Sequence, residues 1–184
     1  MKKFFQISGC LLAFGLYSSS AMAGLYVEPY LGYVISGDSE IKVAGSSISD
    51  GDLTGASYGL RAGWSLPVMF AFGLEYQGGT LTYEVSGSAD EDYDFSAVGL
   101  FASAKFIFVK AYATYFFDAT IEDESNTEYS GSGYKIGVGY TGLPFIAINL
   151  DYSVFNYDEA SPSISGVDVD STMTMLSVSV PFDI

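Results

Sequence analysis

The sequence predicts an all-β fold, an eight-stranded antiparallel up-and-down transmembrane β-barrel. Bulky apolar residues alternate with small or polar residues along eight segments, which is the period of a β-strand. After the N-terminal region, no segment reaches the ~18 consecutive apolar residues that a membrane helix needs. Although no such run is present, hydrophobic residues make up 49% of the chain and aromatic residues 16%, so we expect strands to carry this hydrophobicity. The connections between the segments alternate between short and long.

The N-terminus has the pattern of a cleaved secretory signal peptide. The charged start MKK precedes a short apolar run around Cys10–Tyr17, and Ala21-Met22-Ala23 forms an A-x-A cleavage site. We predict that residues 1–23 are removed and that residues 24–184 form one barrel domain. Cys10 is the one cysteine in the sequence, so its loss would exclude disulfides and thiol chemistry from the mature protein.

The chain is strongly acidic, with seven basic residues, twenty-two acidic residues and a formal net charge of −15. Loss of Lys2 and Lys3 with the signal peptide leaves five basic residues and takes the net charge to −17. This acidity argues against a nucleic-acid partner. The abundance of aromatic and aliphatic residues argues against disorder.

Eight segments alternate in this way, and none shows a 3.6-residue apolar stripe. In chain order they are 25–35, 55–65, 69–85, 94–106, 109–118, 131–141, 144–157 and 169–184. The short connections lie near 66–68, 107–108 and 141–143, and the longer polar connections span 36–54, 86–93, 119–130 and 158–168. With both termini in the periplasm, this alternation predicts short periplasmic turns and four longer outer loops. Eight strands is the count of the smallest membrane barrels.

The two faces of each segment differ in residue size. In 55–65, for example, Tyr58, Leu60 and Trp64 lie on one face, whereas the other face carries glycine, serine and Arg61. A water-soluble barrel turns its bulky apolar face inward, but here the small and charged face suits a crowded lumen and the bulky face suits lipid.

Charged residues within the strands occupy the polar face, and four of the five mature basic residues are among them. The set comprises Glu28, Arg61, Glu75, Lys105, Lys110, Lys135 and Asp151. Because unpaired charges are expensive in a narrow lumen, we predict that these residues form an interior salt-bridge network. In particular, Lys135 is expected to meet Glu28, Glu75 or Asp151 across the barrel.

Aromatic residues near the strand ends predict two interfacial girdles. The periplasmic girdle would comprise Trp64, Phe70, Phe145 and Phe182, and the outer girdle Tyr33, Tyr58, Tyr76 and Tyr115.

Eighteen of the twenty-two acidic residues lie in or beside the longer connections. Six of them are possible ligands for a divalent cation, because calcium accepts carboxylate oxygens: Asp90, Glu91, Asp92, Glu122, Asp123 and Glu124. None has the twelve-residue EF-hand spacing, so we interpret them first as solvated acidic loop tips.

In order and spacing, these segments resemble the OmpA/OmpX-type family of small Gram-negative outer-membrane barrels. The resemblance rests on YVEPYLGY (26–33), YGLRAGW (58–64), GYKIGVGY (133–140), AINLDYSV (147–154) and an aromatic C-terminal strand. It implies an outer-membrane location, contact with membrane lipid and lipopolysaccharide, and delivery by the barrel-assembly machinery. In relatives the final strand usually ends in Phe, and the barrel-assembly machinery reads this ending. This chain ends SVSVPFDI, with Ile last, so it departs from that signal.

The sequence argues against catalysis because it contains no histidine. Outer-membrane barrels that resemble lipid A acyltransferases, lipid A deacylases, phospholipases or omptin proteases all rely on an active-site histidine. Ser103 and Lys105 could in principle act as a catalytic nucleophile and base, because strand alternation places them on the same face, but no other feature of the sequence supports this pair. We therefore predict no enzyme, no cofactor and no resident metal.

The predicted function is a structural or surface-interaction role, with acidic loops displayed over a charge-paired, plugged lumen and an external loop partner that the sequence does not identify. Two alternatives stay open: a narrow channel for ions or small solutes, and a barrel that binds a small hydrophobic ligand.

Overall fold

The structure is a computed structural model that describes residues 24–43, 46–67, 69–84, 91–122, 127–161 and 167–183. The predicted signal peptide, with Cys10, lies outside the described residues, and its cleavage stays a prediction. Among the described residues, no helix is long and apolar enough to cross a membrane.

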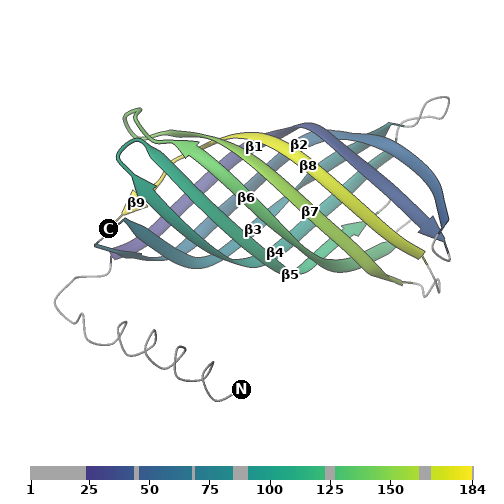
Figure 1. Cartoon of the computed structure of the whole chain (residues 1–184). Helices are drawn as coiled ribbons and strands as arrows, with labels where there is room; N and C mark the ends of the chain where they lie inside the picture. Colours follow the sequence, from purple (N-terminus) through teal and green to yellow (C-terminus); the bar gives the residue numbers. More distant parts are fainter. Residues whose placement is uncertain are drawn as a thin grey trace, which may run out of the picture.

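The described chain folds into one closed antiparallel sheet, as Figure 1 shows. Its strands are β1 (Gly24–Val43), β2 (Ser46–Leu66), β3 (Phe70–Glu84), β4 (Glu91–Phe106), β5 (Val109–Glu122), β6 (Glu128–Tyr140), β7 (Ala147–Ser161), β8 (Val167–Ser179) and β9 (Phe182–Asp183). From β1 to β8, each strand pairs with the next along the chain, and β1 closes the ring by pairing with both β2 and β8. This architecture confirms the predicted eight-stranded all-β barrel.

The last strand of the barrel is interrupted once. β8 ends at Ser179, and the two-residue β9 continues along the same edge of β1, opposite Tyr26 and Val27. Pro181 separates the two pieces because proline has no N–H to donate to the ladder. The N–H of Val180 still donates to the carbonyl of Pro29 at 3.0 Å, so the edge stays bonded across the break.

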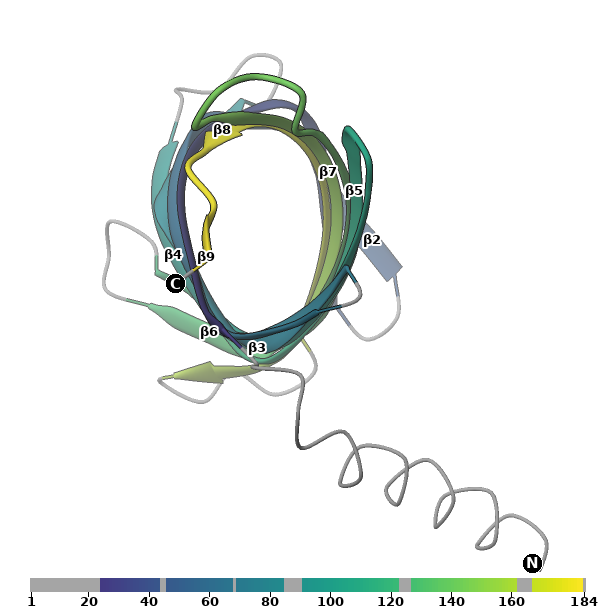
Figure 2. The same cartoon turned by 90° about the vertical axis from the view of Figure 1, so that its left-hand side faces the viewer.

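We call the end at which β1 begins and β9 ends the proximal end, and the opposite end the distal end. Figure 2 looks into the barrel from the proximal end and shows the strands closed into one ring. The proximal connections lie at 67–69, 107–108 and 141–146. Among the described residues, each connection has a non-glycine residue in the left-handed region: Met69 (φ 74°), Ile107 (φ 52°) and Phe145 (φ 65°). These turns are strained for residues with a Cβ, and all three side chains are exposed.

The predicted connections at the distal end were too long. β1 runs to Val43 and β2 begins at Ser46, so most of the expected 36–54 loop is paired strand. β4, β5, β6 and β7 likewise extend into the other three predicted loops. The sequence interpretation ended each strand where the apolar alternation faded, but the backbone ladder continues through polar residues because its hydrogen bonds do not depend on side-chain polarity.

The exterior of the barrel has a band of apolar side chains near the proximal end. On β2 it runs from Leu66 to Tyr58, and beyond it come Thr54 and the exposed Asp52. On β3 it runs from Phe70 to Tyr76. Its extent along each strand is close to the ~9–11 residues with which a tilted strand crosses a bilayer. The distal part of the exterior is polar and acidic.

The interior shows the opposite change along the axis. Among the described residues, fifteen buried side chains pack into one apolar cluster that begins at Tyr30, beside the polar half, and fills the distal part with residues such as Leu53, Leu81, Phe116 and Met175. The rings of Phe116 and Phe155 lie 5.4 Å apart. The distal half is therefore apolar inside and polar outside, like a water-soluble barrel, whereas the proximal half has polar residues inside and apolar residues outside. Sequence reasoning missed this inversion.

Candidate functional site

The candidate site is a set of six buried charged residues that meet in the proximal half of the lumen. Three are acidic and three are basic, so their formal charges balance. They come from six strands: Glu28 (β1), Arg61 (β2), Glu75 (β3), Lys110 (β5), Lys135 (β6) and Asp151 (β7). None is more than 3% exposed. All six belong to the predicted lumen set.

Strand register explains the first row of contacts. Arg61 lies directly opposite Glu28 on β1 and directly opposite Glu75 on β3. Register partners share a face of the sheet, so all three side chains point inward. The Nη1 atom of Arg61 lies 3.2 Å from Glu28 Oε2, and its Nε atom lies 3.2 Å from Glu75 Oε1.

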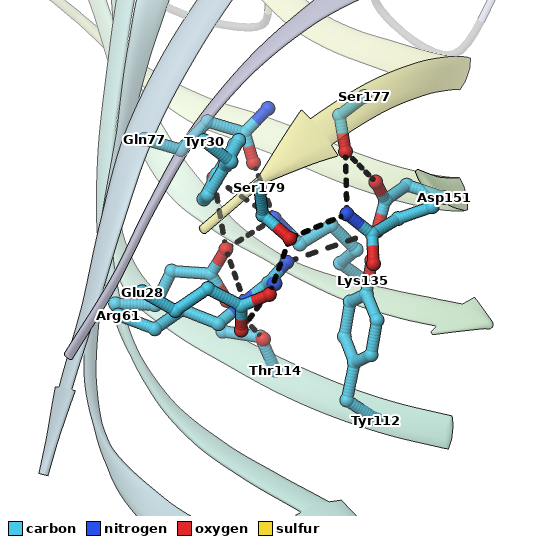
Figure 3. A network of polar contacts seen from close by, with 12 residues as sticks. Glu28, Tyr30, Arg61, Gln77, Tyr112, Thr114, Lys135, Asp151, Ser177 and Ser179 are labelled. Atoms are coloured by element: carbon cyan, nitrogen blue, oxygen red, sulfur yellow. Dashed lines mark hydrogen bonds and ion pairs between the residues drawn. The ribbon is translucent and has the colours of Figure 1, made fainter. Parts of the chain in front are cut away.

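Two lysines from the opposite wall complete the ion pairs. Lys135 Nζ donates to Glu75 Oε1 at 2.5 Å and to Gln77 Oε1 at 2.7 Å (Figure 3). Lys110 Nζ forms an ion pair with Glu28. These contacts join β5 and β6 to β1 and β3, so the network crosses the barrel from wall to wall.

Neutral side chains supply further donors, and sequence reasoning missed them. Tyr30 donates to Glu75 at 2.8 Å, and Ser179 donates to Glu28 at 2.6 Å. The other carboxylate contacts are Tyr26 with Glu28, Thr114 with Glu75, and Tyr112 and Ser177 with Asp151. On β1 and β5 the tyrosines and Thr114 alternate in step with Glu28 and Lys110, and that shared periodicity is the signal by which they could have been found. Ser177 and Ser179 lie on β8, which carries no charged residue of the network.

Arg61 lies at the centre of the network between two aromatic rings. Its guanidinium carbon lies 4.0 Å from the ring centroid of Tyr112 and 4.8 Å from that of Tyr30. Its Nη2 atom lies 3.9 Å from Asp151 Oδ1, beyond hydrogen-bond distance. The Nε and Nη2 atoms of Arg61 are buried and make no well-aligned hydrogen bond among the described residues. The two cation–π contacts stabilise the desolvated guanidinium in addition to its ion pairs.

The structure places Lys105 outside this network. Its alternation along β4 puts it on the lumen face, as expected, but it is the penultimate residue of the strand and its side chain is exposed at the proximal mouth. The expectation of a buried salt bridge for Lys105 was therefore wrong. Position along the strand, and not only the face, decides whether a lumen residue is desolvated.

The candidate divalent-cation acids are only partly described. Asp90, Asp123 and Glu124 lie outside the described residues, and the side chain of Glu91 is not described. Asp92 is exposed on β4 and accepts a hydrogen bond from Thr82 at 2.9 Å, whereas Glu122 lies at the end of β5. In the described part of the chain, no three His, Cys, Asp or Glu residues are grouped so that they could hold a metal ion. Calcium binding stays a prediction.

The eight residues of the predicted girdles all have exposed side chains on the described surface. Trp64, Phe70, Phe145 and Phe182 lie at or near the proximal end, and Tyr33, Tyr58, Tyr76 and Tyr115 lie further along the strands. Trp64 packs near Phe72 at a centroid distance of 6.4 Å, and Tyr58 near Tyr76 at 6.3 Å. These positions match the rims of the exterior apolar band.

Comparison with protein-family models and with curated proteins found no match. The solved structures that are similar to this chain include Ail, the attachment invasion locus protein of Yersinia pestis, in complex with the heparin analogue sucrose octasulfate. That structure is 16% identical, covers 88% of this chain and 100% of its own, and has a TM-score of 0.52.

Two further solved structures are similar at TM-scores below 0.5. Neisserial surface protein A is 18% identical and covers 86% of this chain and 97% of its own, with a TM-score of 0.49. The outer membrane protein OprG from Pseudomonas aeruginosa is 13% identical, and the match covers 89% of this chain and 98% of OprG, with a TM-score of 0.48. The likeness to Ail supports the fold, and at this identity it supports nothing beyond the fold.

Proposed function

We propose that this protein is a non-enzymatic, integral outer-membrane barrel of the OmpA/OmpX type, with a structural or surface-interaction role and a lumen closed to solutes. The proximal end would face the periplasm and the acidic distal end the exterior. The observation that carries the proposal is the charge-balanced network that joins opposite walls of the lumen.

The lumen contents argue against an open pore. Eight strands enclose a space that side chains are able to fill. Here the proximal half holds three buried cations, each ion-paired to a carboxylate, and the distal half holds an apolar cluster. An ion in transit would have to separate buried ion pairs and then cross a dry apolar layer, and both steps are costly.

The same contacts argue against catalysis. A general base needs a free acceptor within reach of a substrate. Each of Glu28, Glu75 and Asp151 accepts hydrogen bonds from at least two side chains, and each is buried. The sequence has no histidine that would serve in their place.

The exterior supports a membrane location and an exposed acidic surface. The apolar band suits the hydrocarbon core, with its aromatic rims at the interfaces. Distal to the band, the exposed side chains on β4, β5 and β6 include Asp94, Glu122 and Glu128. The heparin analogue bound by Ail is a polyanion, and such a ligand would be repelled by these carboxylates. We therefore propose partners other than polyanions for this chain.

Planar-bilayer conductance tests the closed lumen. We expect the wild-type protein to give no steady open-channel current. Lys135→Ala and Glu75→Ala each remove one side of a buried ion pair, so we expect occasional conducting events from both variants. Lys105→Ala is the matched control, because Lys105 is exposed outside the network, and it should behave as the wild type does. Steady wild-type currents that change with Lys135→Ala or Glu75→Ala would instead favour a narrow channel.

A further inference from the structure

The proximal mouth of the lumen contains a cavity of about 240 Å³ that the closed-lumen proposal does not use. Its wall carries two lysines, three serine or threonine hydroxyls, the phenol of Tyr26 and one carboxylate. The lysines are Lys105 and Lys110, the hydroxyls are those of Ser65, Ser103 and Thr141, and the carboxylate is Asp183. Leu66, Met69 and Phe70 of the β2–β3 turn line its edge, where the exterior apolar band begins. The cavity is therefore polar inside and lies next to the membrane interface.

The two lysines lie directly opposite each other on β4 and β5. Like charges at facing positions destabilise a sheet unless an anion lies near them. Lys110 is 3% exposed and has Glu28 as its partner. Lys105 makes no ion pair within the described part of the chain, so its ammonium group is the cation available to a ligand.

The hydroxyl groups add hydrogen-bond donors to the same wall. Thr141 Oγ1 is buried and has no hydrogen-bond partner among the described residues. Ser65 donates a long hydrogen bond to the carbonyl of Gly24, at 3.4 Å. Hydroxyls and an ammonium group are the donors that oxyanion oxygens accept.

Asp183 limits the charge of the ligand. It lies on β9 directly opposite Tyr26, whose side chain also lines the cavity. A carboxylate in the wall disfavours a dianion more than a monoanion, because Coulomb repulsion scales with the ligand charge. We propose that this cavity binds a phosphodiester monoanion, with Lys105 and the hydroxyl groups as its donors. Both a free glycerophosphodiester and the headgroup of an anionic phospholipid have this chemistry.

A titration followed by ³¹P NMR tests the proposal. The protein, purified in dodecyl maltoside, a detergent that contains no phosphate, is titrated with glycerophosphoglycerol. We expect saturable binding that Lys105→Ala weakens about tenfold or more, the range for a hydrogen bond to a charged group. Asp183→Asn should strengthen binding, because it removes the repelling charge. Lys42→Ala is the matched control: Lys42 lies near the distal end of β1, and its loss should leave the affinity unchanged.

A second arm separates the two sources of phosphodiester. In nanodiscs that contain phosphatidylglycerol, loss of the soluble probe's binding would assign the site to the lipid headgroup, whereas unchanged binding would assign it to the free diester. The proposal is overturned if the wild type shows no binding at millimolar probe. It is also overturned if Lys105→Ala binds as the wild type does and is folded, which a folded barrel shows by running at a different apparent mass in gel electrophoresis before and after boiling. Weaker binding by Asp183→Asn would overturn it too.

Discussion

At the scale of single residues, the lumen network shows how a lysine is accommodated in a strand whose other face is bulky and apolar. Lys135 lies between Tyr134 and Ile136, which are both exposed on the barrel exterior, while its own side chain is fully buried. Its ammonium group meets Glu75 and Gln77 of β3 and the hydroxyl of Tyr30 at 3.2 Å. These three oxygen atoms accept hydrogen bonds from the ammonium group and offset the loss of its hydration.

The costs of removing the two members of the Lys135–Glu75 pair should not add. We expect Lys135→Met to destabilise the barrel by about 3–5 kcal/mol, since it leaves Glu75 buried without its main counter-charge. Lys135→Met combined with Glu75→Gln should cost less than the sum of the two single changes. Urea titration of the protein folded in lipid vesicles measures each free energy of unfolding.

The matched control for this cycle is Lys105→Met, which removes an exposed lysine from the same face and should change stability by less than about 0.5 kcal/mol. Strict additivity of Lys135→Met and Glu75→Gln would contradict direct coupling between the two residues.

At the scale of the strands, β5 shows how a bulge changes which residues face the core. Phe116 pairs with Gly133 and Ala119 pairs with Gly131, with a register shift between them. Phe117 and Asp118 both point outward as a result. Strict alternation would have turned Asp118 into the apolar cluster, where an unpaired carboxylate is costly.

Adjacent phenylalanines at this bulge provide a matched pair for measuring the distal core. Phe116 is fully buried, whereas Phe117 is 50% exposed on the exterior. We expect Phe116→Ala to cost about 3–5 kcal/mol, because it opens a cavity against Phe155. Phe117→Ala should cost about 1 kcal/mol or less, because it empties no packed volume. Equal losses in urea titrations of the two variants would argue that the distal core is loosely packed.

At the scale of the whole molecule, charge and apolarity are separated along the barrel axis. Register places Asp94 opposite Glu122, and Glu122 opposite Glu128, in one row across β4, β5 and β6. Like charges at facing positions reduce stability, and the row lies on the polar exterior. The surplus of acids in the sequence is therefore concentrated on the end that we propose to be extracellular.

This separation of charge predicts that the barrel attracts positively charged macromolecules. In nanodiscs of zwitterionic lipid at low ionic strength, we expect the protein to bind polylysine and not heparin. The binding should weaken steeply as salt is raised, because exposed charges are screened. A variant with Asp94→Lys, Glu122→Lys and Glu128→Lys should bind polylysine less tightly. Retention of the wild type on heparin at ~0.15 M salt would contradict the predicted charge preference.

The sequence alone determined the barrel and the alternation behind its exterior apolar band, and it predicted the aromatic rims and the inward direction of the charged residues. These features follow from a side-chain period of two, which assigns every residue of a strand to one of two faces. Local alternation also placed Arg61 and Lys135 on the lumen side without any knowledge of their partners.

Only the tertiary structure decided how residues meet across the lumen and where the strands end. Closure of the ring joins Lys135 to Glu75 and Lys110 to Glu28, and it leaves Lys105 at the mouth. Such pairings depend on strand register and on tilt around the whole barrel, which single-strand periodicity does not contain. The apolar distal core was hidden for a related reason: beyond the exterior apolar band the two faces exchange roles, and alternation by itself does not say which face is inside.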